Sequence, residues 1–387
     1  MQYRQFGKTD KKVSALGFGC MRLPVIGGGN TGKNVDFEEA ARMIRCAIDN
    51  GVNYMDTAYP YHGGVSEVAL GKALKDGYRQ KVYVADKSPV FFIQKEGDFD
   101  RFLDEQLRRL DDEHIDFYLL HSLSSDTWRN VVQKFDLIGK AERAKKAGKI
   151  GHIGFSFHDN YPAFDEILNG WDGFEFGQIQ LNYLNEQHQA GMKGLKALEQ
   201  KGIGVVIMEP LMGGKLADPP DKVTAVFEQS GSSRTPVQWA LDYLWDMDSV
   251  STVLSGMSTM QQVEDNLAYA NAFTAGSVTD ADRKVITEAK ETFEKLIAVP
   301  CTGCAYCLPC PFGVNIPRNF TAYNDLAAYE DPAYGNTSFK HFIGWEGKEA
   351  AATSCTGCRA CEDKCPQNIM ISEELPKVAA AFAELLK

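Results

Sequence analysis

Short apolar runs alternate with longer segments whose apolar residues recur every three or four positions, from residue 14 to residue 272. The short runs have the length of strands, and the longer segments have the spacing of amphipathic helices. This pattern predicts strands at 14–19, 53–56, 82–87, 117–121, 151–156, 176–181, 204–208 and 251–255. It predicts helices at 36–50, 65–77, 98–110, 135–147, 159–169, 189–201, 235–246 and 260–272.

Eight consecutive strand–helix units predict an α/β fold, a closed (β/α)8 TIM barrel. A doubly wound open sheet is the alternative architecture. It is less favoured because the glycine fingerprint of dinucleotide-binding sheets is missing after the first strand at 14–19. We assign residues 1–297 to the barrel domain. This range begins with a short polar hairpin at 2–13, ahead of the first barrel strand, and a helical stretch at 280–298 follows the last barrel helix.

Reactive side chains stand at the ends of three consecutive predicted strands. Asp56 ends the second strand and Tyr61 follows five residues later, while Lys87 and His121 end the third and fourth strands. The carboxyl ends of parallel strands meet on one face of a barrel, where such folds carry out their chemistry. Any one of these residues alone is more often a packing residue or half of a buried ion pair. All four at strand ends favour a catalytic site.

The four side chains suit the reduction of a carbonyl group by hydride. The carbonyl oxygen gains negative charge during this reaction and needs a proton. Tyr61 can supply that proton if a nearby cation lowers its pKa, and Lys87 can serve as this cation if Asp56 holds it in place. His121 can then orient the carbonyl group.

Over residues 1–297 the sequence resembles the aldo/keto reductase superfamily. Asp56-Thr57-Ala58 followed by Tyr61, with Lys87 and His121 at the family's spacing, match its catalytic tetrad. The resemblance implies a barrel enzyme that binds an extended nicotinamide cofactor without a Rossmann domain. It implies that Tyr61 is the general acid/base and that His121 orients the carbonyl.

The resemblance also implies cofactor contacts at the mouth of the barrel. Met208 departs from the family, which has an aromatic residue there, and Phe157 departs from the polar residue usual after Ser156. Lys215 is the candidate to bind a 2′-phosphate, so NADP(H) is favoured over NAD(H). Arg22 suits the cofactor pyrophosphate, an acidic substrate or a surface position. The implied contacts are Gly19, Met21, Arg22, Ser156, Gln178, Met208, Pro210, Leu211, Lys215, Gly256, Ser258, Gln262, Asp265 and Asn266.

Cysteine residues crowd into the last part of the chain, where eight of the ten lie. The first run is C-x2-C-x2-C-x2-C-P, with Cys301, Cys304, Cys307 and Cys310, and the second is C-x2-C-x2-C-x3-C-P, with Cys355, Cys358, Cys361 and Cys365. The second spacing is that of bacterial ferredoxins, where the fourth cysteine binds the other of two clusters. Structural zinc is less favoured, because triple x2 spacing followed by proline is typical of iron–sulfur sites. We expect two 4Fe-4S clusters, with Cys310 and Cys365 crossing over.

Residues 298–387 therefore read as a small ferredoxin-like iron–sulfur domain with a helical insertion at 311–354. The combination resembles the iron–sulfur branch of the aldo/keto reductases. A nicotinamide gives up two electrons as hydride, whereas each cluster takes one. The clusters are therefore structural, exchange electrons with a ferredoxin or flavin partner, or sense redox state, and the sequence leaves these alternatives open.

Composition narrows the class of partner. The formal net charge of −11 argues against a nucleic-acid or anionic-membrane partner. No run of 18 apolar residues and no basic-then-apolar leader is present, so we expect a cytoplasmic protein without a membrane span. The expected substrate is a small carbonyl compound or alcohol. Loop residues expected to ring the pocket are His62, Phe91, Phe92, Trp128 and Tyr183.

Overall fold

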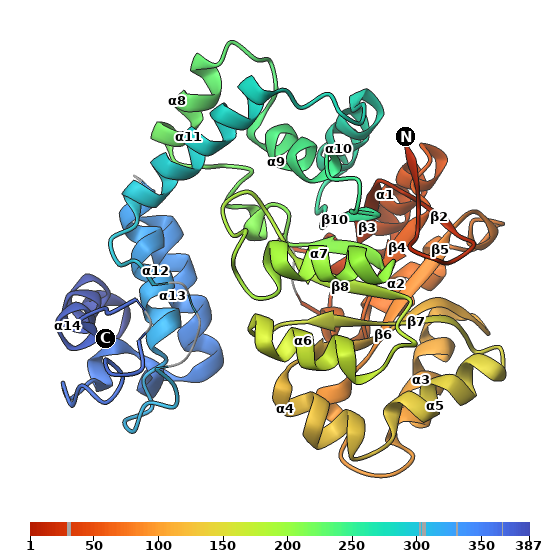
Figure 1. Ribbon diagram of the computed structural model, residues 1–387, viewed down its shortest axis with the longest axis horizontal. Coiled ribbons are helices and arrows are strands. Elements are labelled where there is room, and N and C mark those ends of the chain that lie inside the picture. Colours follow the sequence, from red (N-terminus) through yellow and green to blue (C-terminus); the bar gives the residue numbers. More distant parts are fainter. Residues whose placement is uncertain (29–31, 302, 304–306, 330–331, 366) are drawn as a thin grey trace. The chain divides into compact units, whose positions relative to one another are not determined.

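The structure is a computed structural model that describes residues 1–28, 32–301, 303, 307–329, 332–365 and 367–387. The chain forms two compact units (Figure 1). The first comprises Met1–Gly214 and Val237–Val278, and the second comprises Lys215–Pro236 and Thr279–Lys387. The unit with the cysteine runs thus takes in more of the chain than 298–387. The domain boundary at residue 297 stays a prediction.

The first unit is a closed barrel of parallel strands in the order β10-β3-β4-β5-β6-β7-β8-β9, which confirms the predicted fold class. Each strand pairs with the next one along the chain, and β10 closes the ring against β3. The strands are β3 Leu16–Gly19, β4 Tyr54–Asp56, β5 Tyr83–Ser88, β6 Ile115–Leu123, β7 Ile150–Phe157, β8 Phe176–Gln180, β9 Gly204–Met208 and β10 Thr252–Ser255.

Helices follow the strands and cover the barrel, because their apolar stripes need burial against the sheet (Figure 1). Local sequence sets their ends: Asp36 accepts a hydrogen bond from the Glu39 N–H at the start of α1, and Gly202 ends α7 with φ 66°. These helices are α1 Phe37–Asp49, α2 Ser66–Ala73, α3 Asp98–Leu110, α4 Ser125–Thr127, α5 Leu137–Lys146, α6 Tyr161–Gly170, α7 Gly191–Lys201, α9 Pro236–Trp245 and α10 Met260–Ala272, with a π-helical segment at Trp128–Gln133.

A hairpin of β1 (Tyr3–Gln5) and β2 (Lys12–Ser14) packs at the amino ends of the barrel strands. Its turn residue Phe6 is fully buried and lies 4.6 Å from the ring of Phe117 and 5.3 Å from that of Phe176, centroid to centroid. The hairpin thus fills the lower barrel with aromatic side chains. The face at the carboxyl ends of the strands, where barrels of this kind place their active sites, lies opposite the hairpin.

The second unit is helical over its described residues, with α8 Asp221–Gln229, α11 Asp280–Leu296, α12 Ile316–Ala328, α13 Ala333–Glu346 and α14 Ile371–Ala381. Helix α12 lies within the predicted helical insertion at 311–354. The sequence pattern did not mark α13 as a separate helix within this insertion, because Gly335 and Gly344 interrupt its apolar spacing. Phe339 and Phe342 of α13 are buried in the core of this unit. Trp345 at its end is 82% exposed.

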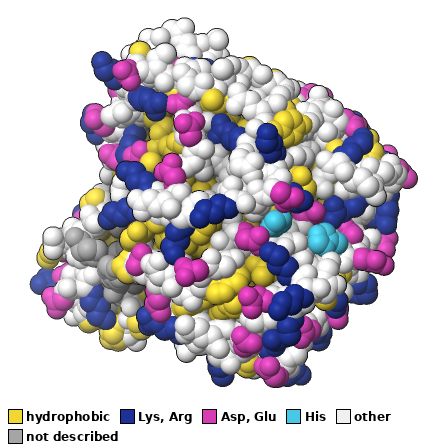
Figure 2. Space-filling view, turned by 45° about the vertical axis from the view of Figure 1, so that its right-hand side comes forward, with side chains coloured by type: hydrophobic (Ala, Val, Ile, Leu, Met, Phe, Trp, Pro, Cys, Tyr) yellow, Lys and Arg dark blue, Asp and Glu magenta, His cyan; other side chains and the backbone are white. Residues whose placement is uncertain are grey.

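On the face shown in Figure 2, Lys and Arg side chains lie interspersed with Asp and Glu side chains. Exposed ion pairs of the protein include Arg129 with Glu166 and Lys149 with Asp104. Pairs of this kind contribute little to stability, roughly 0–1 kcal/mol each. Among the helices of the described residues, none is both long and apolar enough to cross a membrane.

Candidate active site

Asp56, Lys87 and Tyr61 meet at the carboxyl end of the barrel. Asp56 ends β4, Lys87 lies in the neighbouring β5, and Tyr61 begins a one-turn segment after β4. The Lys87 ammonium donates to Asp56 Oδ1 at 2.7 Å and to the Thr57 carbonyl oxygen at 2.7 Å, and it lies 3.5 Å from Tyr61 Oη. Lys87 is fully buried, so this ion pair is shielded from solvent screening.

His121 completes the predicted set of four. Its ring centroid lies 6.0 Å from that of Tyr61 at an interplanar angle of 82°. A register shift between Leu120 and Leu123 bends the end of β6, a device that re-aims side chains at strand ends. Burial, with the nearby positive charge of Lys87, lowers the pKa of His121 well below its usual range, so the imidazole is neutral. The structure thus brings the four residues together.

Electrostatics at Tyr61 differ from the sequence expectation of a lowered pKa. Burial raises the pKa of Tyr61, and the Lys87 ammonium offsets only part of that rise. Burial pulls the pKa of Lys87 down, but Asp56 and Tyr61 outweigh it and the pKa of Lys87 is raised. The arrangement therefore holds a protonated phenol beside a stable ammonium, which suits proton donation.

Ser156 and Gln178 lie side by side at the ends of β7 and β8, where they are register partners. The Ser156 hydroxyl accepts from the Ser122 N–H at 2.7 Å. Gln178 Nε2 faces the Met208 sulfur at 3.6 Å, while Gln178 Oε1 is buried and has no hydrogen-bond partner among the described residues. A buried amide oxygen without a donor is costly unless a ligand supplies one. A carboxamide NH2 group, as on a nicotinamide, fits this position.

The residues expected at the other end of the cofactor form a second group around Arg22. Ser258 Oγ donates to the Arg22 carbonyl oxygen at 2.8 Å, and Gln262 Oε1 accepts from the Ser258 N–H at 2.7 Å. A Cβ on Gly256 would lie 3.4 Å from the Arg22 side chain. Together with the start of α10, this group combines a guanidinium with backbone N–H groups, a combination that suits a phosphate.

The other expected contacts lie nearby, with different roles. Gly19 ends β3, and a Cβ there would lie 3.3 Å from the Ser255 carbonyl oxygen. Met21 follows it and is 47% exposed. Asn266 is buried and donates to Ser255 Oγ at 2.8 Å, so its amide braces the loop. The remaining three follow β9 or lie on α10: Pro210, which is buried, Leu211, which is half-buried, and Asp265, which accepts from Gln261.

Lys215 is not part of either group. It lies in the second unit, where its ammonium forms an ion pair with Asp325 and its carbonyl oxygen accepts from the Tyr329 hydroxyl at 3.0 Å. The pairing neutralises the charge that the sequence assigned to a 2′-phosphate. The sequence could not reveal the pair because its partners are 110 residues apart.

Among the aromatic loop residues, Phe91 and Phe92 are 41% and 48% exposed, and the Phe91 ring lies 5.5 Å from His121. Trp128 and Tyr183 are buried. His62 Nε2 accepts from the Leu23 N–H at 3.1 Å, and its other ring nitrogen pairs with the Gly32 carbonyl oxygen. His62 therefore braces two loops, and Phe91 is the aromatic residue next to the catalytic set.

The two cysteine runs begin with the same local structure. The Gly303 N–H donates to Cys301 Sγ and the Gly357 N–H to Cys355 Sγ, each at 3.4 Å, with φ 69° and 70° at the two glycines. Hydrogen bonds to sulfur are a usual feature of iron–sulfur sites. Among the cysteines of the two runs that the structure describes, no disulfide is formed; they are Cys301, Cys307, Cys310, Cys355, Cys358, Cys361 and Cys365, while Cys304 lies outside the described residues.

Cys355, Cys358 and Cys361 of the second run lie near one another. The pKa of Cys361 is raised by burial, and nearby Glu362, Cys355 and Cys358 add to the rise. In the described part of the chain, no three His, Cys, Asp or Glu side chains are placed to hold a single metal ion. A four-iron cluster spreads its thiolates over separate irons, so its ligands lie farther apart than those of one ion. The assignment of these cysteines to clusters therefore rests on their spacing in the sequence and stays a prediction.

Comparison with known proteins agrees with both halves of this description. Residues 15–286 match the model of the aldo/keto reductase family, and residues 300–370 match that of the 4Fe-4S dicluster domain. The chain belongs to the aldo/keto reductase family. Members of this family are oxidoreductases that use NAD(P)H. The predicted family and the attached iron–sulfur domain are confirmed.

Relatives of this aldo/keto reductase share the barrel. The chain is 30% identical to L-galactose dehydrogenase of Arabidopsis thaliana, over 76% of this chain and 95% of that protein. It is 25% identical to the NADH-specific methylglyoxal reductase of Escherichia coli (strain K12), over 75% and 98%. The holo form of aldo-keto reductase AKR11C1 from Bacillus halodurans superposes with a TM-score of 0.62 and 28% identity, over 75% and 96%.

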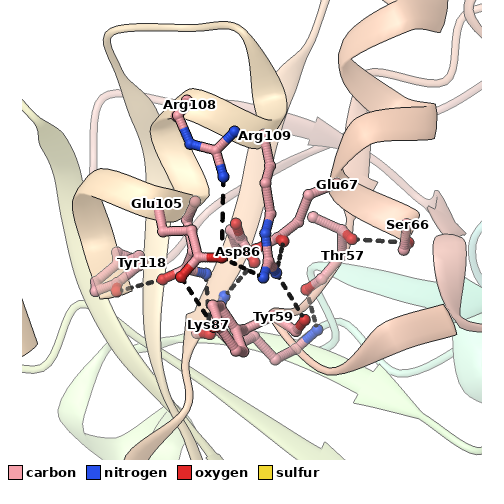
Figure 3. A network of polar contacts seen from close by, with 11 residues as sticks. Thr57, Tyr59, Ser66, Glu67, Asp86, Lys87, Glu105, Arg108, Arg109 and Tyr118 are labelled. Carbon is pink, nitrogen blue, oxygen red and sulfur yellow. Dashed lines mark hydrogen bonds and ion pairs between the residues drawn. The ribbon is translucent and has the colours of Figure 1, made fainter. Parts of the chain in front are cut away.

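Behind Lys87 lies a network that sequence reasoning missed (Figure 3). Arg109 on α3 donates to Glu67 of α2 at 2.7 Å and to Glu105 at 2.5 Å. Asp86 precedes Lys87 in β5 and accepts from the Lys87 N–H at 2.7 Å. The available signal was an acidic residue inside the predicted apolar strand at 82–87, because a buried carboxyl group needs a partner.

Proposed function

We propose that the protein is an NAD(P)H-dependent reductase of a small aldehyde or ketone, or catalyses the reverse oxidation of the alcohol. One observation carries the proposal: a buried ammonium, that of Lys87, contacts both a carboxylate and the phenol of Tyr61 beside a neutral His121. Replacement of Tyr61 by Phe, which deletes only the phenol oxygen, tests it.

The residues divide the work as follows. When bound, a reduced nicotinamide supplies the hydride to the carbonyl carbon. Tyr61 Oη donates its proton to the carbonyl oxygen, and the Lys87 ammonium 3.5 Å away stabilises the negative charge left on the phenol. Asp56 holds that ammonium in place. Neutral His121 orients the carbonyl oxygen by hydrogen bonding without adding charge.

Ser156 and Gln178 would hold the nicotinamide carboxamide, and the group around Arg22 and Ser258 would hold the phosphates. The unpartnered Gln178 Oε1 supports the first assignment. Phe91 beside His121 favours a substrate with an apolar portion next to its carbonyl group. The relatives named for L-galactose and methylglyoxal fit the same class, a small carbonyl or hydroxyl compound.

Replacement Lys215→Ala is expected to leave the ratio of kcat/KM for NADPH and NADH within about twofold of its original value, because Lys215 is already paired with Asp325. The measurement is steady-state reduction with each cofactor. A drop with NADPH alone, of about tenfold, would instead assign Lys215 to the 2′-phosphate. Lys222→Ala, on α8 of the same unit, is the matched control for loss of a positive charge.

The C-terminal cysteines are proposed to hold two 4Fe-4S clusters, with Cys310 and Cys365 each completing the cluster of the other run. With these clusters, the second candidate function is electron exchange with a ferredoxin or flavin partner, and redox sensing is a further alternative. The match to a dicluster domain favours it. Carbonyl reduction and cluster electron exchange can be distinguished by asking whether electrons pass from the nicotinamide to the clusters.

Mixing the oxygen-free protein with NADPH or NADH is expected to leave the visible cluster absorbance unchanged on the timescale of carbonyl turnover. The physical reason is that hydride carries two electrons as a pair, whereas each cluster accepts one. Stopped-flow absorbance measures this, with dithionite reduction as the reference for full bleaching. Bleaching at the turnover rate would favour the electron-transfer function.

A further inference from the structure

A pair of fully buried carboxyl groups, Asp86 and Glu67, lies directly behind the catalytic lysine (Figure 3). Among the described residues, Asp86 Oδ2 and Glu67 Oε1 are each buried without a hydrogen-bond partner, and the two carboxyl groups lie next to each other, with the Gln106 amide beside Glu67. Two ionised carboxylates cannot hydrogen-bond to each other. One proton between them satisfies both oxygens at once.

Counting the charges leads to the same result. The Lys87 ammonium is committed to Asp56, and the single positive charge of Arg109 is divided between Glu67 and Glu105. Glu105 is 27% exposed and can be solvated, but Glu67 and Asp86 have no exposure. An ionised Asp86 would be a buried charge without a cation of its own, which costs several kcal/mol.

We propose that Asp86 and Glu67 share one proton at neutral pH, and that this acid–carboxylate pair positions Lys87 for its work with Tyr61. Asp86 Oδ1 accepts from the Lys87 N–H at 2.7 Å. On the other side of the residue, Gln106 Nε2 donates to the Lys87 carbonyl oxygen at 3.1 Å. The backbone of the lysine is thus held from both sides. The positioning role rests on the proposed function, whereas the shared proton does not.

The groups that face the pair come from five elements. Burial and the neighbouring Glu67 raise the pKa of Asp86 well above its usual range, against the opposing effect of Lys87. Arg109 and Glu105 of α3 face Glu67, and the Tyr118 hydroxyl of β6 donates to Gln106 at 2.7 Å. Asp56 of β4 binds the lysine, and the buried thiol of Cys20 faces Asp86. Arg109 and Lys87 are the cations among these groups.

Infrared difference spectroscopy tests the shared proton without relying on turnover. The intact protein, purified without oxygen, is compared with Asp86→Asn at neutral pH. Asparagine keeps the shape, accepts from the Lys87 N–H and donates to Glu67, so the variant folds. We expect a protonated-carboxyl C=O band in the original protein that Asp86→Asn lacks. Glu105→Gln, at the other carboxylate of Arg109, is the control and keeps the band. Absence of the band from the original protein overturns the proposal.

The pH dependence of the free energy of unfolding is an independent test for the shared proton. An acid whose folded-state pKa is raised binds its proton more tightly when folded, so its contribution falls as pH rises from the unfolded value of about 4 towards the folded value. The urea midpoint of Asp86→Asn should therefore rise relative to that of the original protein as pH increases above about 4, the unfolded pKa of an aspartic acid. A constant difference across this range counts against the shared proton.

The positioning role predicts a split between kinetic constants. Asp86→Ala removes the contacts to the Lys87 N–H and to Glu67, so kcat should fall about tenfold while KM stays within about twofold. Asp86→Asn should restore kcat, because the amide makes the same two hydrogen bonds. If Asp86→Asn shows the infrared and stability changes but loses kcat as Asp86→Ala does, the positioning role is wrong although the shared proton stands. Failure of Tyr61→Phe to impair reduction would refute the catalytic assignment itself.

Discussion

Replacing Tyr61 by Phe should lower kcat/KM for carbonyl reduction by about 10²–10⁴-fold, the range that a positioned proton donor contributes. The phenol is the group whose oxygen lies 3.5 Å from the Lys87 ammonium, and its raised pKa keeps the proton on it at neutral pH. The measurement is steady-state reduction of a small aldehyde, with cofactor binding followed separately by fluorescence. Cofactor affinity should not change, since the ring remains.

Tyr59→Phe is the matched control for this variant. Its hydroxyl donates to Glu105 at 3.0 Å, away from Lys87, and its ring lies under the Arg109 guanidinium. Loss of one partly exposed hydrogen bond should cost about 1 kcal/mol of stability and leave the rate within about twofold. Equal rates for Tyr61→Phe and the original protein would mean that the four strand-end residues do not form a proton-donating site.

Replacing Lys87 by Met should destabilise the protein by about 3 kcal/mol, because it leaves Asp56 buried without its cation. Reduction should be lost with it. Burial raises the pKa of Asp56, and Lys87 is the group that opposes this rise. Without Lys87 the carboxyl group takes up a proton, so the stability lost relative to the original protein should be smallest near pH 4 and should grow as pH rises. Urea unfolding at several pH values measures this.

A double replacement separates stability from chemistry. Asp56→Asn together with Lys87→Met removes both charges and should recover most of the lost stability, while reduction stays absent because no cation faces Tyr61. Lys149→Met is the control, since its pair with Asp104 is exposed and is worth less than about 1 kcal/mol. Recovery of activity in the double variant would show that the ammonium has no part in proton transfer.

Much of the barrel could be predicted from local pattern. The predicted helix at 98–110 is α3 Asp98–Leu110, and the strand at 204–208 is β9 Gly204–Met208, because strand length and helical spacing are properties of neighbouring residues. Helix α13 was not predicted as a separate helix within the insertion at 311–354, because its glycines weaken the local pattern and its burial depends on packing against α12. The cysteine spacing is equally local, so it identified the attached domain.

The sequence by itself determined the order of elements, the four residues at strand ends and the two cysteine runs. The closed barrel brings strand ends together whatever the loops do, so topology alone placed Asp56, Lys87 and His121 on one face. The tertiary structure decided which charged groups form pairs and how far each is buried from solvent. It pairs Lys215 with Asp325, raises the pKa of Tyr61 by burial, and places Asp86 next to Glu67. Charge pairing and burial depend on residues far apart in the chain, and no local pattern encodes them.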